Sequence, residues 1–318
     1  NATRTANLTD STVVMILSES FSDPTRIPDV TFSIDPMPNI RAIKNATTSG
    51  LMLSPRYGGG TANIEYQALT GLNMANFDES MLSVYQQLVP SQEEPYSFNR
   101  IWSEQYGESG SIAFHPYYKN MYLRDHNYDR FGFSELLTLD SDPAIKHQDR
   151  IDASPYVSDA ASYANVLDAI NSQDHPQFIQ LVTMQNHSIY GDYYATNEFR
   201  EADLSLLDDN ERWQIENYTK GLSLTDQATA DFLNTLNTTA NADMDNTLTL
   251  HETDYFIWSN QASASANGKV SGEHTAFSST NYCMSLAAEH MNAAVSPYLA
   301  LLTELQREIP SISRVCRA

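Results

Sequence analysis

The chain is organised around residues 57–72, which read YGGGTANIEYQALTGL. Three consecutive glycines precede Thr61, and apolar residues then recur at helical spacing at Ile64, Ala68, Leu69 and Leu72. The glycines let a ligand approach the main chain closely. The unpaired N–H groups and dipole of a helix N-terminus favour a phosphate or sulfate there. Thr is also a common helix cap. The stretch therefore predicts an amphipathic helix that starts at an anion site, with Thr61 either a ligand or a cap.

The composition excludes several classes of protein. With 40 acidic against 18 basic residues the net charge is −22, whereas a nucleic-acid partner needs a basic surface. The glycine stretch lacks the Lys-Ser/Thr ending of a nucleotide P-loop. No apolar run in the printed sequence approaches the roughly 18 residues that span a bilayer. At 41% hydrophobic residues, the chain has enough apolar material for a folded core.

Short apolar runs alternate with longer helical patterns along the chain. Residues 12–17, TVVMIL, are apolar or β-branched throughout, as in a strand buried on both faces of a parallel sheet. Further strands are expected at 50–55, 110–114, 177–184 and 255–259, and helices at 39–46, 77–90, 98–107, 161–171, 211–237, 283–293 and after Pro297. This alternation predicts an α/β fold with a mostly parallel sheet covered by helices on both faces.

Three of the expected strands lead into a reactive side chain: Glu19, His115 and His187. Each of them alone is compatible with a structural role. Because the carboxyl ends of parallel strands gather at one edge of a sheet, we expect all three to converge on Thr61. Carboxylate and hydroxyl oxygens suit Mg²⁺ or Mn²⁺, and a metal on the hydroxyl would favour its alkoxide, a nucleophile. Arg124 and the histidines could then bind a tetrahedral anion.

Four ordered segments carry a resemblance to a known family. They are VVMILSES (13–20), GGGTANIEYQALTGL (58–72), FHPYYKNMYLRD (114–125) and LVTMQNH (181–187). Together they resemble the extracellular catalytic domain of the lipoteichoic acid synthase family, within the alkaline phosphatase and sulfatase superfamily. The resemblance covers roughly residues 12–262. It implies an α/β/α sandwich with a mostly parallel central sheet as the catalytic domain, residues 1–262, and a small, largely helical C-terminal extension, residues 263–318.

The resemblance also implies an activity. In that family one divalent cation, Mn²⁺ or Mg²⁺, is bound by the residues that correspond to Glu19 and Thr61. The Thr is the nucleophile that attacks the phosphorus of phosphatidylglycerol, releases diacylglycerol and becomes glycerophosphoryl-threonine. The glycerol phosphate then passes to a glycerol phosphate polymer or a glycolipid.

The substrate-binding residues of the family correspond to His115, Arg124 and His187. Tyr122 stands where the family usually has Trp. The expected protein is the outward-facing domain of a transferase, held at the extracellular face of a Gram-positive cell membrane by an upstream segment, with no nucleic-acid partner.

One part of the family pattern is not found. The family completes its metal site with an Asp-His pair between the long helix and the strand at 254–260. Between Leu233 and His251 the sequence reads NTLNTTANADMDNTLTL, without that pair. Either the metal site is weakened, or the printed sequence omits residues of the natural chain. Glu273 and His274 could act as substitutes, although they follow the last expected core strand.

Two other functions remain open at this point. A phosphodiesterase of the same superfamily would share the nucleophile and the metal but use water as acceptor. Sulfatases generally use a modified Cys or Ser as the nucleophile, so Thr61 argues against that branch. A non-catalytic relative that binds teichoic acid would account for the absent Asp-His pair.

Overall fold

The computed structural model of the chain describes residues 5–27, 30–46, 51–53, 60–201, 204, 207–238 and 277–279. The central sheet has four strands in the order β1-β5-β3-β4, and all of its neighbouring strands are parallel. The strands are β1 (Val13–Leu17), β3 (Ser111–His115), β4 (Glu135–Thr138) and β5 (Phe178–Val182). This arrangement places the carboxyl ends of the four strands at one edge of the sheet.

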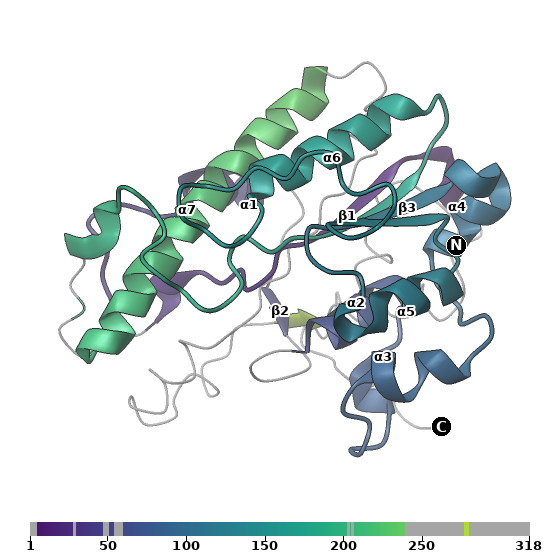
Figure 1. The fold of residues 1–318 in the computed structure, drawn as a ribbon, viewed down its shortest axis with the longest axis horizontal. Coiled ribbons are helices and arrows are strands. Elements are labelled where there is room, and N and C mark those ends of the chain that lie inside the picture. Colours follow the sequence, from purple (N-terminus) through teal and green to yellow (C-terminus); the bar gives the residue numbers. More distant parts are fainter. Residues whose placement is uncertain are drawn as a thin grey trace.

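Helices cover both faces of this sheet. They are α1 (Pro38–Ala46), α2 (Thr61–Thr70), α3 (Val84–Gln87), α4 (Asn99–Tyr106), α5 (Arg124–Arg130), α6 (Asp159–Ser172) and α7 (Asp209–Thr238). In Figure 1, α6 and α7 lie on one side of the strands, and α2 and α5 lie on the other. The predicted α/β architecture with a parallel sheet between two helical layers is therefore confirmed.

The alternation of side chains along β1 explains the two layers. Val13 and Met15 belong to the hydrophobic cluster that includes Trp102 of α4 and residues of α2 and α5. Val14 and Ile16 belong to the opposite cluster, which is built with residues of α6 and α7. Successive residues of a strand point to opposite faces. All five residues of β1 are buried, as the uninterrupted apolar run predicts.

Two expected elements differ from the structure, and one strand of the central sheet was not expected. The strand within residues 50–55 is β2 (Leu51–Leu53), which pairs with β6 (Phe277–Ser279) in a separate two-stranded parallel sheet. The central sheet instead has β4 at its edge, a strand that sequence reasoning did not identify. Its first three side chains are exposed or half-buried, so it lacks the apolar pattern of a buried strand.

The expected helix at 77–90 is also wrong. Only α3 and short 3₁₀ turns form there. The Asp78 carboxylate accepts hydrogen bonds from the Ser80 backbone N–H at 3.0 Å and from the Ser80 hydroxyl at 2.7 Å. Such local bonds stabilise turns in competition with a continuous helix.

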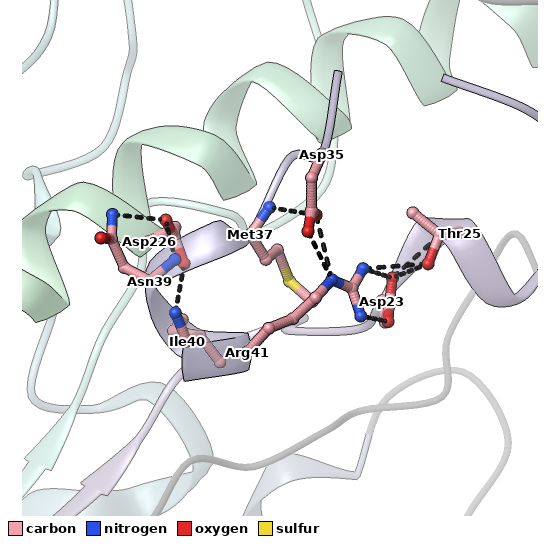
Figure 2. A network of polar contacts seen from close by, with 8 residues as sticks. All are labelled: Asp23, Thr25, Asp35, Met37, Asn39, Ile40, Arg41 and Asp226. Atoms are coloured by element: carbon pink, nitrogen blue, oxygen red, sulfur yellow. Dashed lines mark hydrogen bonds and ion pairs between the residues drawn. The ribbon is translucent and has the colours of Figure 1, made fainter. Parts of the chain in front are cut away.

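A network between α1 and α7 is drawn in Figure 2. The Asp226 carboxylate of α7 accepts hydrogen bonds from the backbone N–H groups of Asn39 and Ile40, at 3.2 and 2.7 Å. These N–H groups lie in the first turn of α1, where a helix has no partners of its own for them. The long helix therefore caps the shorter one through a side chain.

The segment that follows β1 is attached to the same network. Arg41 of α1 binds Asp23 at 2.7 Å and Asp35 at 2.8 Å. Burial would raise the pKa of Asp23, but hydrogen bonds from Arg41 and Thr25 outweigh it and hold that pKa below its usual value. Since Asp23 follows Glu19 by four positions, these contacts restrain the loop that begins with Glu19.

Several expectations concern residues outside those that the structure describes. They are the strand at 254–260, the helices at 283–293 and after Pro297, and the boundary between residues 262 and 263. Across the described ranges, none of the helices combines the length and the apolar character that crossing a bilayer requires.

Candidate active site

The residues singled out from the sequence come from four different elements. Glu19 follows the end of β1 by two residues, His115 is the last residue of β3, and His187 lies five residues beyond β5. Thr61 is the first residue of α2. Side chains at the carboxyl edge of a parallel sheet are placed to share one ligand.

Thr61 and Glu19 are in direct contact, as expected. The Thr61 hydroxyl donates to the Glu19 carboxylate and lies 3.1 and 3.0 Å from its two oxygens. Both residues are buried. Thr61 does not act as the helix cap, because that position belongs to Gly60, which has a φ of 99°. A side chain at such a φ is strained, so glycine is well suited to turn the chain into α2.

The Glu19 carboxylate is held in an unusual environment. Burial raises its pKa, while the charges of His187 and Arg124 and the hydrogen bond from Thr61 act in the opposite direction. Its backbone N–H donates to the Thr183 hydroxyl at 3.3 Å, which ties it to the end of β5. A buried carboxylate whose pKa remains raised is a group that a cation would stabilise.

The pair fits a hard divalent cation in chemical terms. A carboxylate and a hydroxyl oxygen are ligands that Mg²⁺ and Mn²⁺ accept. Within the described part of the chain, no three His, Cys, Asp or Glu side chains gather closely enough to hold a metal. Glu19 and Thr61 would thus supply part of a donor set. The segment where the resemblance places the Asp-His pair lies, from residue 239, outside the described residues.

The structure places His115 against Arg124. The Nδ1 of His115 lies 3.0 Å from the carbonyl oxygen of Val182 and must carry the proton there, since a carbonyl only accepts. Its Nε2 is then free to accept from Arg124 Nη1 at 2.9 Å. Burial and the neighbouring guanidinium lower the pKa of His115 well below its usual value. His115 is therefore a neutral group that orients Arg124.

Glu65 completes this arrangement, although sequence reasoning did not select it. Its carboxylate accepts from Arg124 Nε at 3.2 and 3.1 Å, and from Nη2. The Tyr128 hydroxyl donates to the same carboxylate at 2.7 Å. Burial alone would lower the pKa of Arg124, but Glu65 outweighs it and raises that pKa. The guanidinium thus stays charged and fixed in a buried network.

A signal for Glu65 was present in the sequence. It follows Thr61 by four residues, and residues four apart share one face of a helix. An amphipathic helix would expose its polar residues, so the expected pattern did not indicate a buried role for Glu65. In the structure all ten residues of α2 are buried. Leu72, expected on the apolar face, lies beyond the helix and is 40% exposed. A charged residue in a fully buried helix needs a partner of opposite charge.

Tyr122, which the resemblance places among the substrate-binding residues, packs against Arg124. The guanidinium carbon lies 5.3 Å from the centre of the Tyr122 ring, within the range of a cation–π contact. Tyr122 and Leu123 both have a φ of 57°, which is rare for residues other than glycine. Strained backbone of this kind is frequently found at functional sites.

His187 reaches the same region from the loop after β5. Glu19 experiences its charge, and its Nδ1 lies 2.6 Å from the carbonyl oxygen of Ser188. With Nδ1 as the donor, Nε2 is the nitrogen that a ligand would meet. The preceding Asn186 donates to Thr225 of α7 at 2.8 Å. Gly221 permits this approach, because a Cβ there would lie 2.6 Å from the Asn186 side-chain oxygen.

Most of the chain is similar to known proteins. Residues 11–248 match the sulfatase family. The phosphoglycerol transferase GacH of Streptococcus pyogenes, solved with sn-glycerol-1-phosphate, is 31% identical with a TM-score of 0.83 over 99% of this chain and 83% of its own. The lipoteichoic acid synthase LtaP of Listeria monocytogenes is 20% identical with a TM-score of 0.59, over 79% of this chain and 57% of its own. The second similarity concerns the fold alone.

A curated relative extends the comparison to another organism. A protein of Rhizobium meliloti (strain 1021), whose name assigns it to cyclic beta-1,2-glucan modification, is 31% identical over 218 residues. The match covers 68% of this chain and 32% of the relative, so the chain spans about a third of that protein's length.

Proposed function

The chain belongs to the sulfatase family, and from that premise we propose that it is a metal-dependent phosphoglycerol transferase. It would move glycerol phosphate from phosphatidylglycerol, through a covalent intermediate on Thr61, to a cell-envelope polymer or glycolipid. The observation that carries this proposal is the buried Thr61 hydroxyl within 3.1 Å of both Glu19 oxygens. The similarity to the Streptococcus pyogenes phosphoglycerol transferase at 31% identity supports the transferred group.

Each residue of the site has a role in this reaction. A divalent cation, Mn²⁺ or Mg²⁺, held by Glu19 and Thr61 would favour the alkoxide of Thr61 and polarise the phosphoryl group. Glu19 accepts the hydrogen bond of the Thr61 hydroxyl and is placed to take its proton. Tyr122, Arg124 and His187 bind and orient the glycerol phosphate group around Thr61, and His115 supports this binding by orienting Arg124.

The two steps exchange one phosphate ester bond for another. Thr61 Oγ1 forms a bond to phosphorus, and the bond from phosphorus to the diacylglycerol oxygen breaks, so that diacylglycerol leaves after it takes up a proton. An acceptor hydroxyl then attacks the phosphorus of the glycerophosphoryl-threonine. The bond to Thr61 breaks, and the threonine recovers its proton.

The setting of the reaction is part of the proposal. A domain at the extracellular face of a Gram-positive membrane, anchored by a segment upstream, would meet phosphatidylglycerol directly. The similarity to the Streptococcus pyogenes transferase at 31% identity supports this setting. The name of the Rhizobium relative refers to a glucan, which supports a glycan as one form of the acceptor.

Substitution of Thr61 tests the proposal. The Thr61→Ala variant should lose the release of diacylglycerol from phosphatidylglycerol vesicles in the presence of Mn²⁺, because the nucleophile is removed. Thr61→Ser keeps the hydroxyl and is the matched control, with partial activity expected. Full turnover by the alanine variant would refute the assignment. Release of free glycerol phosphate without growth of an acceptor would instead identify the protein as a phosphodiesterase.

A further inference from the structure

The positive charge of Arg124 is compensated before any substrate binds. Arg124 is buried, and its guanidinium forms an ion pair with the equally buried Glu65. His115 donates through Nδ1 to a carbonyl and accepts from Arg124 through Nε2, which describes a neutral imidazole. The Arg124–Glu65 pair therefore adds directed N–H donors but no net charge to the expected anion site, and the neutral His115 adds no charge.

The contacts of Glu65 identify it as an ionised carboxylate. It accepts from Arg124 Nε at 3.2 and 3.1 Å and from the Tyr128 hydroxyl at 2.7 Å, and it is 0% exposed. The pKa of Tyr128 is raised well above its usual value, first by burial and then by the charge of Glu65.

The location of Glu65 connects it to the nucleophile. Both residues lie on α2, with Glu65 one helical turn after Thr61. The charge of Glu65 is thus fixed relative to the phosphorus that Thr61 would attack. The effective dielectric constant of a buried site is well below that of water. A unit charge one helical turn from the nucleophile therefore changes anion binding strongly there.

Phosphodiesters and phosphate monoesters differ in their charge. A phosphodiester carries one negative charge, whereas a terminal phosphate monoester carries about 1.5 to 2 at pH 7. The proposed function, on which this inference rests, involves only diesters: the phosphatidylglycerol donor, the glycerophosphoryl-threonine and the product. A free arginine charge would favour the more highly charged monoester, and a neutral Arg124–Glu65 pair would not.

We propose that Glu65 is a specificity-determining residue, which neutralises Arg124 so that the site selects singly charged phosphodiesters over doubly charged phosphate monoesters. Glu65 acts through Arg124 and needs no contact with the substrate. The selection is built into the helix that carries the nucleophile.

The experiment measures binding rather than turnover. Titration calorimetry at pH 8 compares two probes on the full chain, sn-glycerol 3-phosphate as the monoester and glycerophosphoglycerol as the diester. The Glu65→Gln variant should shift the ratio of the two dissociation constants toward the monoester, by about ten- to a hundredfold. Tyr128→Phe removes a hydrogen bond to the same carboxylate but keeps its charge, and this control should leave the ratio unchanged.

A second variant guards against misfolding of Glu65→Gln. The double substitution Glu65→Leu with Arg124→Met removes both charges, and buried pairs replaced in this way often remain folded. Its overall binding should weaken, while the ratio should stay within about threefold of the wild-type value, because the net charge is unchanged. The inference is overturned if the ratio is unchanged in Glu65→Gln. It is also overturned if the double variant shifts the ratio as much as is expected for Glu65→Gln. Failure of Thr61 to form an intermediate would refute the proposed function without moving these ratios.

Discussion

Two arginines of this protein bind carboxylates in opposite surroundings. Arg124 and Glu65 have side-chain exposures of 1% and 0%. Arg41, which binds Asp23 and Asp35 (Figure 2), is 33% exposed, and its partners are 14% and 40% exposed. Exposed pairs are screened by water and salt and contribute little to stability. Buried pairs cost desolvation and are very sensitive to the loss of one partner. The two networks therefore differ in their role. The Arg41 network restrains a loop, and the proposed role of the Arg124–Glu65 pair is to set the net charge of the candidate site.

The largest effect is expected when the buried pair is broken on one side. Arg124→Met leaves Glu65 as an unpaired buried charge and should lower the free energy of unfolding by about 3–5 kcal/mol. Urea denaturation followed by circular dichroism measures this. The matched substitution Arg41→Met in the exposed network should cost much less. Equal losses in the two variants would contradict the distinction between the networks.

Asp159 tests the comparison, because it is a buried carboxylate without an arginine partner among the residues that the structure describes. Thr225 donates to it at 2.5 Å. Burial raises its pKa from 3.8 to about 6, against the hydrogen bonds from Thr225 and Thr183. The folded state thus holds this proton more tightly than the unfolded state, so the ionised carboxylate costs stability above pH 6. That cost disappears as the pH falls from about 6 to 3.8.

The Asp159→Asn variant should accordingly gain stability relative to the wild type at neutral pH. The gain should be up to about 3 kcal/mol at pH 7.5 and should shrink toward pH 4. Asp168→Asn is the control with the opposite sign, because hydrogen bonds from Lys146 and His147 lower the pKa of Asp168. Thermal and urea unfolding at several pH values check both variants. A gain for Asp159→Asn that does not change with pH would rule out this explanation.

The smallest effect belongs to the exposed network. Arg41→Met should lower the free energy of unfolding by about 1 kcal/mol or less. The loss should decrease further at 1 M NaCl, where the screening length is about 3 Å. Urea denaturation at low salt and at 1 M NaCl measures this change in the loss. Arg124→Met is the reference, because its loss of unfolding free energy should hardly respond to salt. A salt-independent loss at Arg41 would show that packing of its side chain, rather than its charge, matters.

The sequence was sufficient for elements that are apolar on both faces. β1 was predicted because an uninterrupted apolar run such as VVMIL has few alternatives to a buried strand. β3 and β5 were predicted because apolar residues predominate in SIAFH and FIQLV. β4 was missed because only the last of its four side chains is buried. The helix expected at 77–90 was wrong because residues such as Asp78 form local turns.

The site followed the same principle in part. The contact between Glu19 and Thr61 could be expected, because both lie at the carboxyl edge of a parallel sheet. The partner of Arg124 was missed, because the position of Glu65 four residues after Thr61 does not by itself show which arginine it meets. The role of Glu65 follows from the burial of α2 on every side, which only the structure shows.

The central claim is that Thr61, held against Glu19, is the nucleophile of the reaction. The most direct measurement is peptide mass spectrometry of the protein quenched shortly after mixing with Mn²⁺ and phosphatidylglycerol vesicles. We predict one glycerophosphoryl group on the peptide that contains Thr61, and none in the Thr61→Ala and Glu19→Gln variants. A glycerophosphoryl group on a different residue, or one that persists in the Thr61→Ala variant, would contradict the account.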